Sequence, residues 1–114
     1  MSLSYKLLKT YNSLLINHKT ISFFTKNQTR YLIWLLSVTR FNEPIIKNFN
    51  FFYKNIPDSI SSQVNINNQI DLALENNFLE KKKSDIDKRS TIITATKITM
   101  DEFEIYRKNL NIKI

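Results

Sequence analysis

The sequence contains no glycine. A chain of this length would carry about eight at the usual frequency of roughly 7%. Glycine-rich phosphate-binding loops need backbone without a Cβ pressed against the phosphate, so P-loops and dinucleotide fingerprints are excluded. An all-β fold built on glycine hairpins is also disfavoured, because its turns would have to use Asn or Asp.

Cysteine is absent too, which excludes disulfides, thiolate metal ligands and thiol nucleophiles. His18 is the only histidine and has no partner with which to form a metal site. Its position at the end of a predicted helix suits the helix dipole. Acidic residues at 85–87 lie among lysines, and those at 101–104 lie at a predicted helix start. We therefore expect no catalytic activity, no metal site and no cofactor.

Long apolar runs are also missing. The longest, Tyr31–Leu36, is far shorter than the ~20 residues that a membrane span needs. The N-terminal stretch 1–17 includes Lys6 and Lys9 and has no small-residue cleavage site typical of a signal peptide. These features predict a cytoplasmic protein without a membrane-spanning helix, and a membrane is not its expected partner.

Positive charge is abundant: 17 Lys and Arg against 10 Asp and Glu give a net charge of +7. This balance indicates a polyanionic partner, either nucleic acid or an acidic membrane surface. A basic surface that serves only solubility, or an AT-rich coding bias toward Asn, Lys and Ile, would give the same numbers. A hydrophobic content of 42% predicts a folded chain, which we interpret as one domain over 1–114.

Apolar residues at helical spacing predict an N-terminal helix over 4–18, with Ser4 as its N-cap, and a buried central helix near 31–38. Another helix is expected from Phe49 until Pro57 stops it, after a short strand over 44–47. A C-terminal amphipathic helix is expected over 100–110.

The helix predicted over 59–75 carries the most functional information. Ile66, Ile70 and Ala73 fall on its buried face, and the opposite face is polar and uncharged in its N-terminal half. Asn side chains on such a face can pair with adenine in the major groove, and an apolar group can meet a thymine methyl. A merely solvated polar helix is the alternative interpretation. The helix should end at Asn76-Asn77, one of which replaces Gly in the left-handed conformation.

A β-hairpin is predicted over 78–96, and it carries a dense cluster of Lys81–Lys83, Lys88 and Arg89. Beside a major-groove helix, such a basic wing can contact phosphates and place an Arg in the minor groove. Asp87 would stabilise the wing by pairing with Arg89. Lysines on an exposed hairpin can also serve only to block edge-to-edge pairing. The order of elements is that of a winged helix-turn-helix fold, mainly α with a small β-hairpin.

Residues 79–93, and in particular Asp87 and Arg89, resemble the wing of the MarR superfamily of transcription regulators, closest to its SarA-like branch. The resemblance is good over 61–96 and schematic over 4–52. It implies that Arg89 contacts the minor groove and that terminal helices form a homodimer. The sequence departs from the family at Asn76-Asn77 and in the short stretch after Leu110, which leaves less helix for that dimer.

We therefore expect a transcriptional regulator that binds double-stranded DNA in a sequence-specific manner as a homodimer. The residues expected to bind DNA are Ser61, Ser62, Gln63, Asn65, Asn68, Lys82, Lys83, Lys88 and Arg89. Those expected at the core and subunit contact are Leu8, Tyr11, Leu15, Phe103, Tyr106 and Leu110. Two alternatives stay open: a winged-helix module that binds a host regulatory protein, and a basic protein of the membrane surface.

Overall fold

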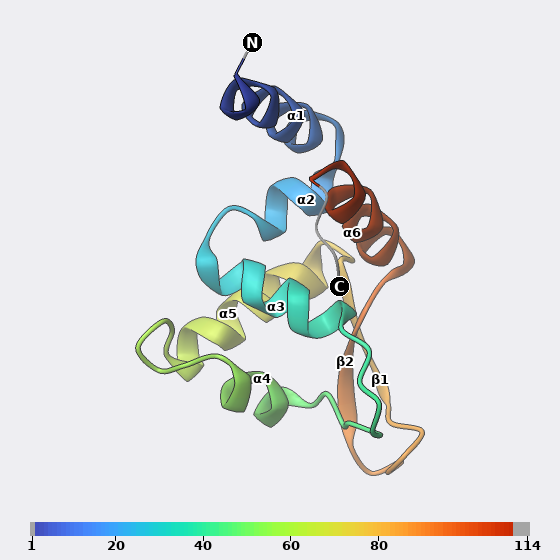
Figure 1. The fold of residues 1–114 in the computed structure, drawn as a ribbon. Helices are drawn as coiled ribbons and strands as arrows, with labels where there is room; N and C mark the ends of the chain where they lie inside the picture. The colour runs from blue at the N-terminus through green and yellow to red at the C-terminus, as the bar shows by residue number, and fades with distance from the viewer. Residues whose placement is uncertain (1, 111–114) are drawn as a thin grey trace.

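The computed structural model describes residues 2–110, which form a set of helices and one hairpin (Figure 1). In chain order the elements are α1 (Leu3–Asn17), α2 (Lys19–Phe24), α3 (Gln28–Val38), α4 (Phe49–Asn55), α5 (Gln63–Glu75), β1 (Leu79–Lys83), β2 (Thr91–Ala95) and α6 (Lys97–Asn109).

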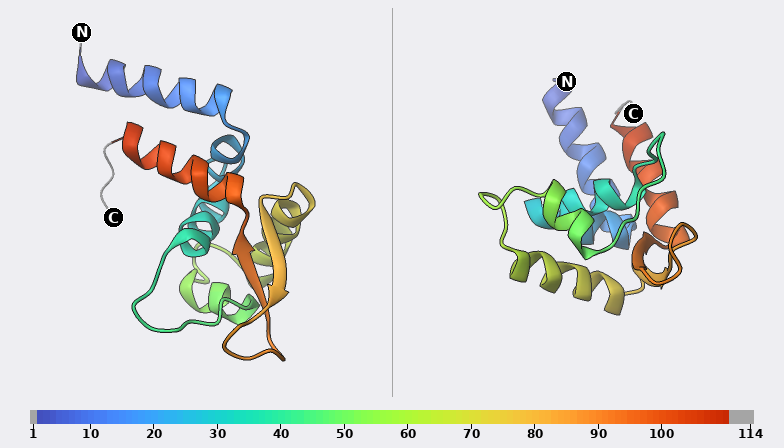
Figure 2. Two further views of the ribbon diagram at one scale, coloured as in Figure 1. Left: turned by 90° about the vertical axis from the view of Figure 1, so that its right-hand side faces the viewer. Right: turned by 90° about the horizontal axis from the view of Figure 1, so that it is seen from below.

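The predicted fold class is confirmed: α4 and α5 form the helix-turn-helix, and β1 and β2 form an antiparallel wing. Leu79 pairs with Ala95 at the base of the wing, and Lys83 pairs with Thr91 near its tip. The described part of the chain is elongated, 54 × 27 × 26 Å. Figure 1 and the left view of Figure 2 place α1 and the wing tip at opposite ends of the long axis.

The first helix begins earlier than predicted. Ser2, not Ser4, is its N-cap, and the Ser2 hydroxyl accepts a hydrogen bond from the Tyr5 amide at 3.2 Å. Ser4 therefore lies inside the helix. Both serines could cap, and apolar periodicity alone does not distinguish caps two residues apart.

Helix α2 was not predicted, because six residues contain too little periodicity to reveal it. Its start is capped from a distant helix: the Thr20 amide donates to Glu102 Oε1 at 2.9 Å. Nδ1 of His18 lies 3.4 Å from the other carboxylate oxygen of Glu102. The Glu102 side chain is only 13% exposed, so this acidic residue joins α6 to the α1–α2 corner instead of facing solvent.

Aromatic rings form the centre of the core, and Trp34 lies among them as predicted. Phe24 stacks on Trp34 with ring centroids 5.5 Å apart, and Phe103 and Tyr106 each approach it at 5.1 Å. Phe103 and Tyr106 are 6% and 7% exposed. Both side chains lie in the core, as predicted, and packing inside the same chain leaves them little surface for the subunit contact that was also expected of them.

The strand predicted over 44–47 does not form. Only one backbone hydrogen bond joins this segment to the wing, from the Ile93 amide to the Lys47 carbonyl at 2.8 Å. Pro44 has no amide hydrogen with which to extend a ladder. The Lys47 ammonium instead donates to the carbonyls of Ser37 and Thr39, which caps the end of α3, and burial lowers the pKa of Lys47.

Helix α5 begins at Gln63 rather than at residue 59, because the preceding residues form a separate turn. In that turn the amides of Ile60 and Ser61 both donate to the Pro57 carbonyl. The hydroxyl of Ser62 then caps the helix by accepting from the Asn65 amide at 3.1 Å.

The end of α5 is as predicted. Asn77 has a φ of 61°, the left-handed conformation normally given to glycine. The Phe78 amide donates to the Ala73 carbonyl and the Asn77 amide to the Leu74 carbonyl, the pair of bonds that defines a Schellman cap. The chain therefore enters β1 directly from the helix without glycine.

The last helix begins at Lys97, three residues before the predicted start at residue 100. Thr96 is its N-cap, but the Thr96 hydroxyl donates to the carbonyls of Asn77 and Phe78 and makes no side-chain cap bond. This contact fixes the base of the wing against the start of α6.

Candidate nucleic-acid interface

The outer face of α5 is a polar surface close to the start of the helix. Gln63, Val64 and Asn68 are exposed, and Val64 is 69% exposed, whereas Ile66 and Ile70 are buried in the core. The first turn contains no acidic residue, so the positive end of the helix dipole is not neutralised there. This half of α5 can accept an anion and present uncharged donors, acceptors and one apolar group to a ligand.

Asn65 and Ser61 do not lie on that outer face, which corrects the sequence prediction. Ser61 is only 5% exposed. The Asn65 amide group donates to Ser61 Oγ at 2.8 Å and to Thr29 Oγ1 at 3.4 Å. Asn65 therefore joins α5 to α3 from the inside, Ser61 is buried beside it, and the polar groups of both residues already have partners within the chain.

A chain of side-chain hydrogen bonds continues along this inner edge of α5. Gln69 Nε2 donates to Asn65 Oδ1 at 3.1 Å, and Arg30 Nε donates to Gln69 Oε1 at 2.6 Å. On the other side of the helix, the Tyr53 hydroxyl donates to the Asn67 side chain and joins α4 to α5. Sequence reasoning did not single out Arg30, Tyr53 or Gln69, because their partners are distant in the chain.

The wing carries the basic side chains predicted for it. Lys82, Lys83, Lys88 and Arg89 are all exposed, and the Arg89 side chain is 94% exposed. Lys88 and Arg89 lie in the tip loop between the strands rather than in a strand. The tip can therefore place its cations against a polyanion without first breaking contacts with the core.

Asp87 organises this tip, as predicted. Its Oδ1 accepts from the Arg89 backbone amide at 3.0 Å and lies 3.4 Å from Arg89 Nε. Its backbone carbonyl accepts from the Ser90 amide at 2.9 Å. The carboxylate thus reduces the conformational freedom of an exposed Arg, which lowers the entropy lost when that Arg binds.

Ser84 is a second organiser of the tip, and sequence reasoning missed it. Its hydroxyl accepts from the amides of Ile86 and Asp87 at 3.1 and 3.3 Å, and its own amide donates to the Ser90 carbonyl. Ser84 is 3% exposed. A serine just before a polar turn is the signal that would have found it.

Lys81 differs from its neighbours in the lysine run. It lies opposite the buried Ile93 in the strand register, and its ammonium sits 5.6 Å from the centre of the Phe49 ring. Lys81 therefore faces α4, whereas Lys82 alternates to the other face of the hairpin. The basic cluster is divided between the two faces of the wing.

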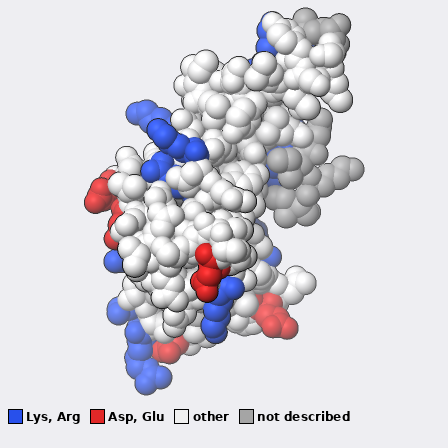
Figure 3. Space-filling view, turned by 90° about the vertical axis from the view of Figure 1, so that its left-hand side faces the viewer, with Lys and Arg blue, Asp and Glu red and all other residues white. Residues whose placement is uncertain are grey.

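Basic and acidic side chains are mixed on the face shown in Figure 3. Lys and Arg lie at the lower end of the molecule and again higher along the same edge, and acidic side chains lie between them and also beside the basic ones at the lower end. Asp71 and Glu75 are exposed on the C-terminal half of α5. A polyanion would therefore meet the N-terminal half of α5 and the wing more favourably than the C-terminal half of α5.

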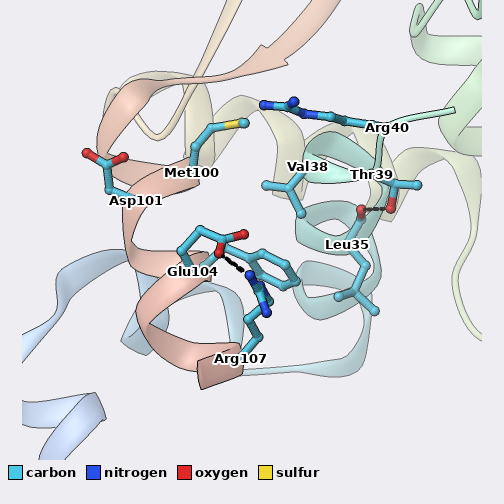
Figure 4. Close-up of a pocket in the computed structure, with 9 residues that line it drawn as sticks. Leu35, Val38, Thr39, Arg40, Met100, Asp101, Glu104 and Arg107 are labelled. Atoms are coloured by element: carbon cyan, nitrogen blue, oxygen red, sulfur yellow. Dashed lines mark hydrogen bonds and ion pairs between the residues drawn. The ribbon is translucent and has the colours of Figure 1, made fainter. Parts of the chain in front are cut away.

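A separate pocket of about 620 Å³ lies between α3 and α6 (Figure 4). Leu35, Val38, Met100 and Phe103 give it apolar walls. Of its acidic residues, Glu104 pairs with Arg107 at 2.6 Å, a contact that lowers the pKa of Glu104, and Asp101 pairs with Lys97. The carboxylates at this pocket are thus occupied by basic neighbours.

Within residues 2–110, no three His, Cys, Asp or Glu side chains lie close enough together to hold a metal ion. In the same range, no helix is both long and apolar enough to cross a membrane.

No family model and no curated protein matches this chain. Among solved structures, the chain is similar to the adhesin competence repressor AdcR from Streptococcus pyogenes, at 23% sequence identity and a TM-score of 0.44. The match covers 98% of this chain and 78% of the AdcR chain.

Proposed function

We propose that this protein is a transcriptional regulator that binds double-stranded DNA in a sequence-specific manner. The main support for this proposal is the direct connection between α5 and the wing. The uncharged, exposed N-terminal half of α5 belongs to a helix that leads directly, through Asn77, into a wing whose exposed tip carries Lys83, Lys88 and Arg89. One element suits base recognition and the other suits the phosphate backbone.

In this proposal α5 enters the major groove by its first turns. Gln63 and Asn68 would pair with base edges, and Val64 would meet a thymine methyl. Ser62 at the helix start and the free amides of the first turn would contact a phosphate. Lys82, Lys83 and Lys88 would contact the backbone, and Arg89 would enter the minor groove. Ser61 and Asn65 would hold α5 in place instead of contacting DNA.

The proposal includes membership of the MarR superfamily and, more narrowly, of its SarA-like branch. Support comes from the wing sequence 79–93, where Asp87, one intervening residue and Arg89 match an Asp-x-Arg pattern in the wing of the family that this segment resembles. A regulator of this type would act in the cytoplasm and would need no cofactor.

The protein is further proposed to act as a homodimer through α1. This helix carries several large apolar side chains on its surface: Leu3 is 73% exposed, Leu7 is 46% exposed and Leu8 is 54% exposed. Tyr11, Leu15 and Leu110 are half-buried beside the core. A second copy of α1 would cover this apolar surface and would give the pair two reading helices related by symmetry.

A binding-site selection from random duplex DNA tests the proposal. We expect enrichment of an AT-rich palindrome whose affinity falls steeply as salt rises. Replacing Lys88 and Arg89 together by Ala should weaken binding and flatten the salt dependence. Replacing Lys6 and Lys108 together by Ala, at exposed sites on α1 and α6, removes the same charge and is the matched control. Absence of any enriched sequence would refute sequence-specific binding, and an enriched site without symmetry would refute the dimer alone.

A further inference from the structure

A second concave surface lies away from the proposed DNA interface. It is a depression of about 470 Å³ formed by the end of α1, by α2, by the start of α3 and by the α5–β1 turn. Phe23 and Phe78 line it as half-buried rings, with centroids 5.2 Å apart, and Ile16 is 82% exposed at its edge. The depression therefore combines a mostly polar lining with the two half-buried rings and one exposed aliphatic side chain.

Three cations surround these apolar side chains: Lys19, Lys26 and Arg30. Lys19 and Lys26 are exposed, and none of the three forms an ion pair with any residue in the described range 2–110. The nearest acidic residue in sequence to the lining is Glu75, which precedes the lining residue Asn76 and does not itself line the depression.

Arg30 is held in a fixed position. Its guanidinium carbon lies 4.2 Å above the centre of the Phe23 ring, and its Nε donates to Gln69 Oε1 at 2.6 Å. A guanidinium stacked on a ring keeps further N–H donors available in a fixed fork, which matches a carboxylate. The site therefore offers one cation held in place, two exposed lysines and the rings of Phe23 and Phe78.

We propose that this depression docks an acidic, amphipathic segment of a partner protein. Carboxylates of the segment would pair with Arg30, Lys19 and Lys26, and its apolar side chains would cover Phe23, Phe78 and Ile16. The three cations favour an acidic partner by charge complementarity, and Phe23, Phe78 and Ile16 favour one that also carries a few apolar residues.

The position of the depression separates it from DNA binding. Asn76 and Phe78 lie at the C-terminal end of α5 and at the base of the wing, whereas the proposed DNA contacts lie at the start of α5 and at the wing tip. Exposed Asp71 and Glu75 on the C-terminal half of α5 would repel a phosphate backbone that continued toward the depression. A concave shape also suits an inserted side chain better than it suits a flat bilayer surface.

Selection of peptides from a random display library against the full chain tests the docking site. We expect enriched peptides that combine Asp or Glu with Leu, Ile or Phe at helical spacing. Their affinity, measured by fluorescence anisotropy, should fall by about tenfold or more when Lys19 and Lys26 are both replaced by Glu. Ile16→Ser, which changes no charge, should weaken the same peptides by a smaller factor, because it removes only apolar contact.

The matched control replaces Lys6 and Lys108 by Glu, which makes the same charge change at exposed sites outside the depression. Peptide binding should persist in this control. The proposal is overturned if acidic peptides are not enriched, or if they bind the Lys19 and Lys26 variant as well as the unmodified chain. It is also overturned if that variant loses duplex DNA or anionic-vesicle binding instead, which would assign the surface to those ligands. The Lys88 and Arg89 variant of the wing should lose DNA binding but keep peptide binding, so failure of the DNA proposal can be distinguished from failure of the docking proposal.

Discussion

The side-chain amide of Asn65 donates a hydrogen bond to the hydroxyl of Ser61, 2.8 Å away and one helical turn earlier. This bond, together with the contacts of Asn65 to Thr29 and Gln69, faces α3 and not solvent. Asn68, one turn beyond Asn65, is exposed instead. Two asparagines that look equivalent in the sequence therefore have different surroundings in the fold.

We predict that Asn65→Ala and Asn68→Ala separate stability from recognition. Asn65→Ala should lower the free energy of unfolding by about 1–2 kcal/mol, because buried partners lose their hydrogen bonds. Asn68→Ala should leave stability nearly unchanged and relax the preference at one or two base pairs of the selected site. Urea denaturation and binding to a panel of single-base variants measure the two effects. A loss of base preference with unchanged stability in Asn65→Ala would contradict this assignment.

Asp87 gives a prediction with an unexpected sign. Removing a negative charge from a DNA-binding tip should strengthen binding if charge alone mattered. Because Asp87 holds both the backbone and the side chain of Arg89, we expect Asp87→Asn to weaken duplex binding by a few-fold. Exposed Asp85, in the same loop, provides the control, since Asp85→Asn should strengthen binding slightly. Titration of a labelled duplex at fixed salt distinguishes the two variants.

The sequence pattern predicts those elements that depend on residues close together in the chain. It does not predict elements or contacts that depend on residues far apart in the chain. Ile66, Ile70 and Ala73 repeat at helical spacing, so the buried face of α5 could be predicted. Helix α2 could not, because its cap is the carboxylate of Glu102 on α6. Asn65 was misplaced for the same reason: its partner Thr29 lies 36 residues away in the chain.

The wing shows the same division between local and distant evidence. Asp87 and Arg89 are separated by a single residue, so their pairing was predictable from the sequence. The division of the lysine run depends on register and on the Phe49 ring, which spacing alone does not place. The depression near Arg30 was invisible in the sequence, because α1, α2, α3 and the α5–β1 turn contribute to it.

We predict that the protein becomes less stable at alkaline pH because of Tyr106. Burial, and then the hydrogen bond from its hydroxyl to Tyr31, raise the pKa of Tyr106 above its ordinary value of 10.0. Above about pH 10 the hydroxyl of Tyr106 loses its proton in the unfolded chain but keeps it in the folded chain. The free energy of unfolding therefore declines as the pH rises above 10. Tyr106→Phe should reduce the decline, as measured by urea unfolding at neutral and alkaline pH. Tyr5→Phe, at a side chain that is 45% exposed, should leave the decline intact.

Leu8 tests the proposed subunit contact. Its side chain is 54% exposed, so Leu8→Glu should not unfold the single chain. If α1 of a second copy covers it, the substitution buries a charge in an apolar contact and should shift the protein from dimer to monomer. Light scattering coupled to gel filtration measures the mass. Ile98→Glu, at an exposed site on α6, is the control that should remain dimeric. An unmodified chain that stays monomeric at every concentration would refute the contact.

Asn77 provides the most direct test of the turn between α5 and the wing. Its φ of 61° is unfavourable for residues with a Cβ, less so for Asn and not at all for Gly. Asn77→Ala should therefore lower the free energy of unfolding by about 1 kcal/mol, whereas Asn77→Gly should preserve or slightly raise it. Asn76 has a φ of −87°, so Asn76→Gly gains nothing from relief of strain and is the matched control. Because the turn sets how the wing leaves α5, Asn77→Ala should also weaken duplex binding, and Asn77→Gly should not. Equal stability of the Ala and Gly variants at position 77 would contradict the left-handed conformation.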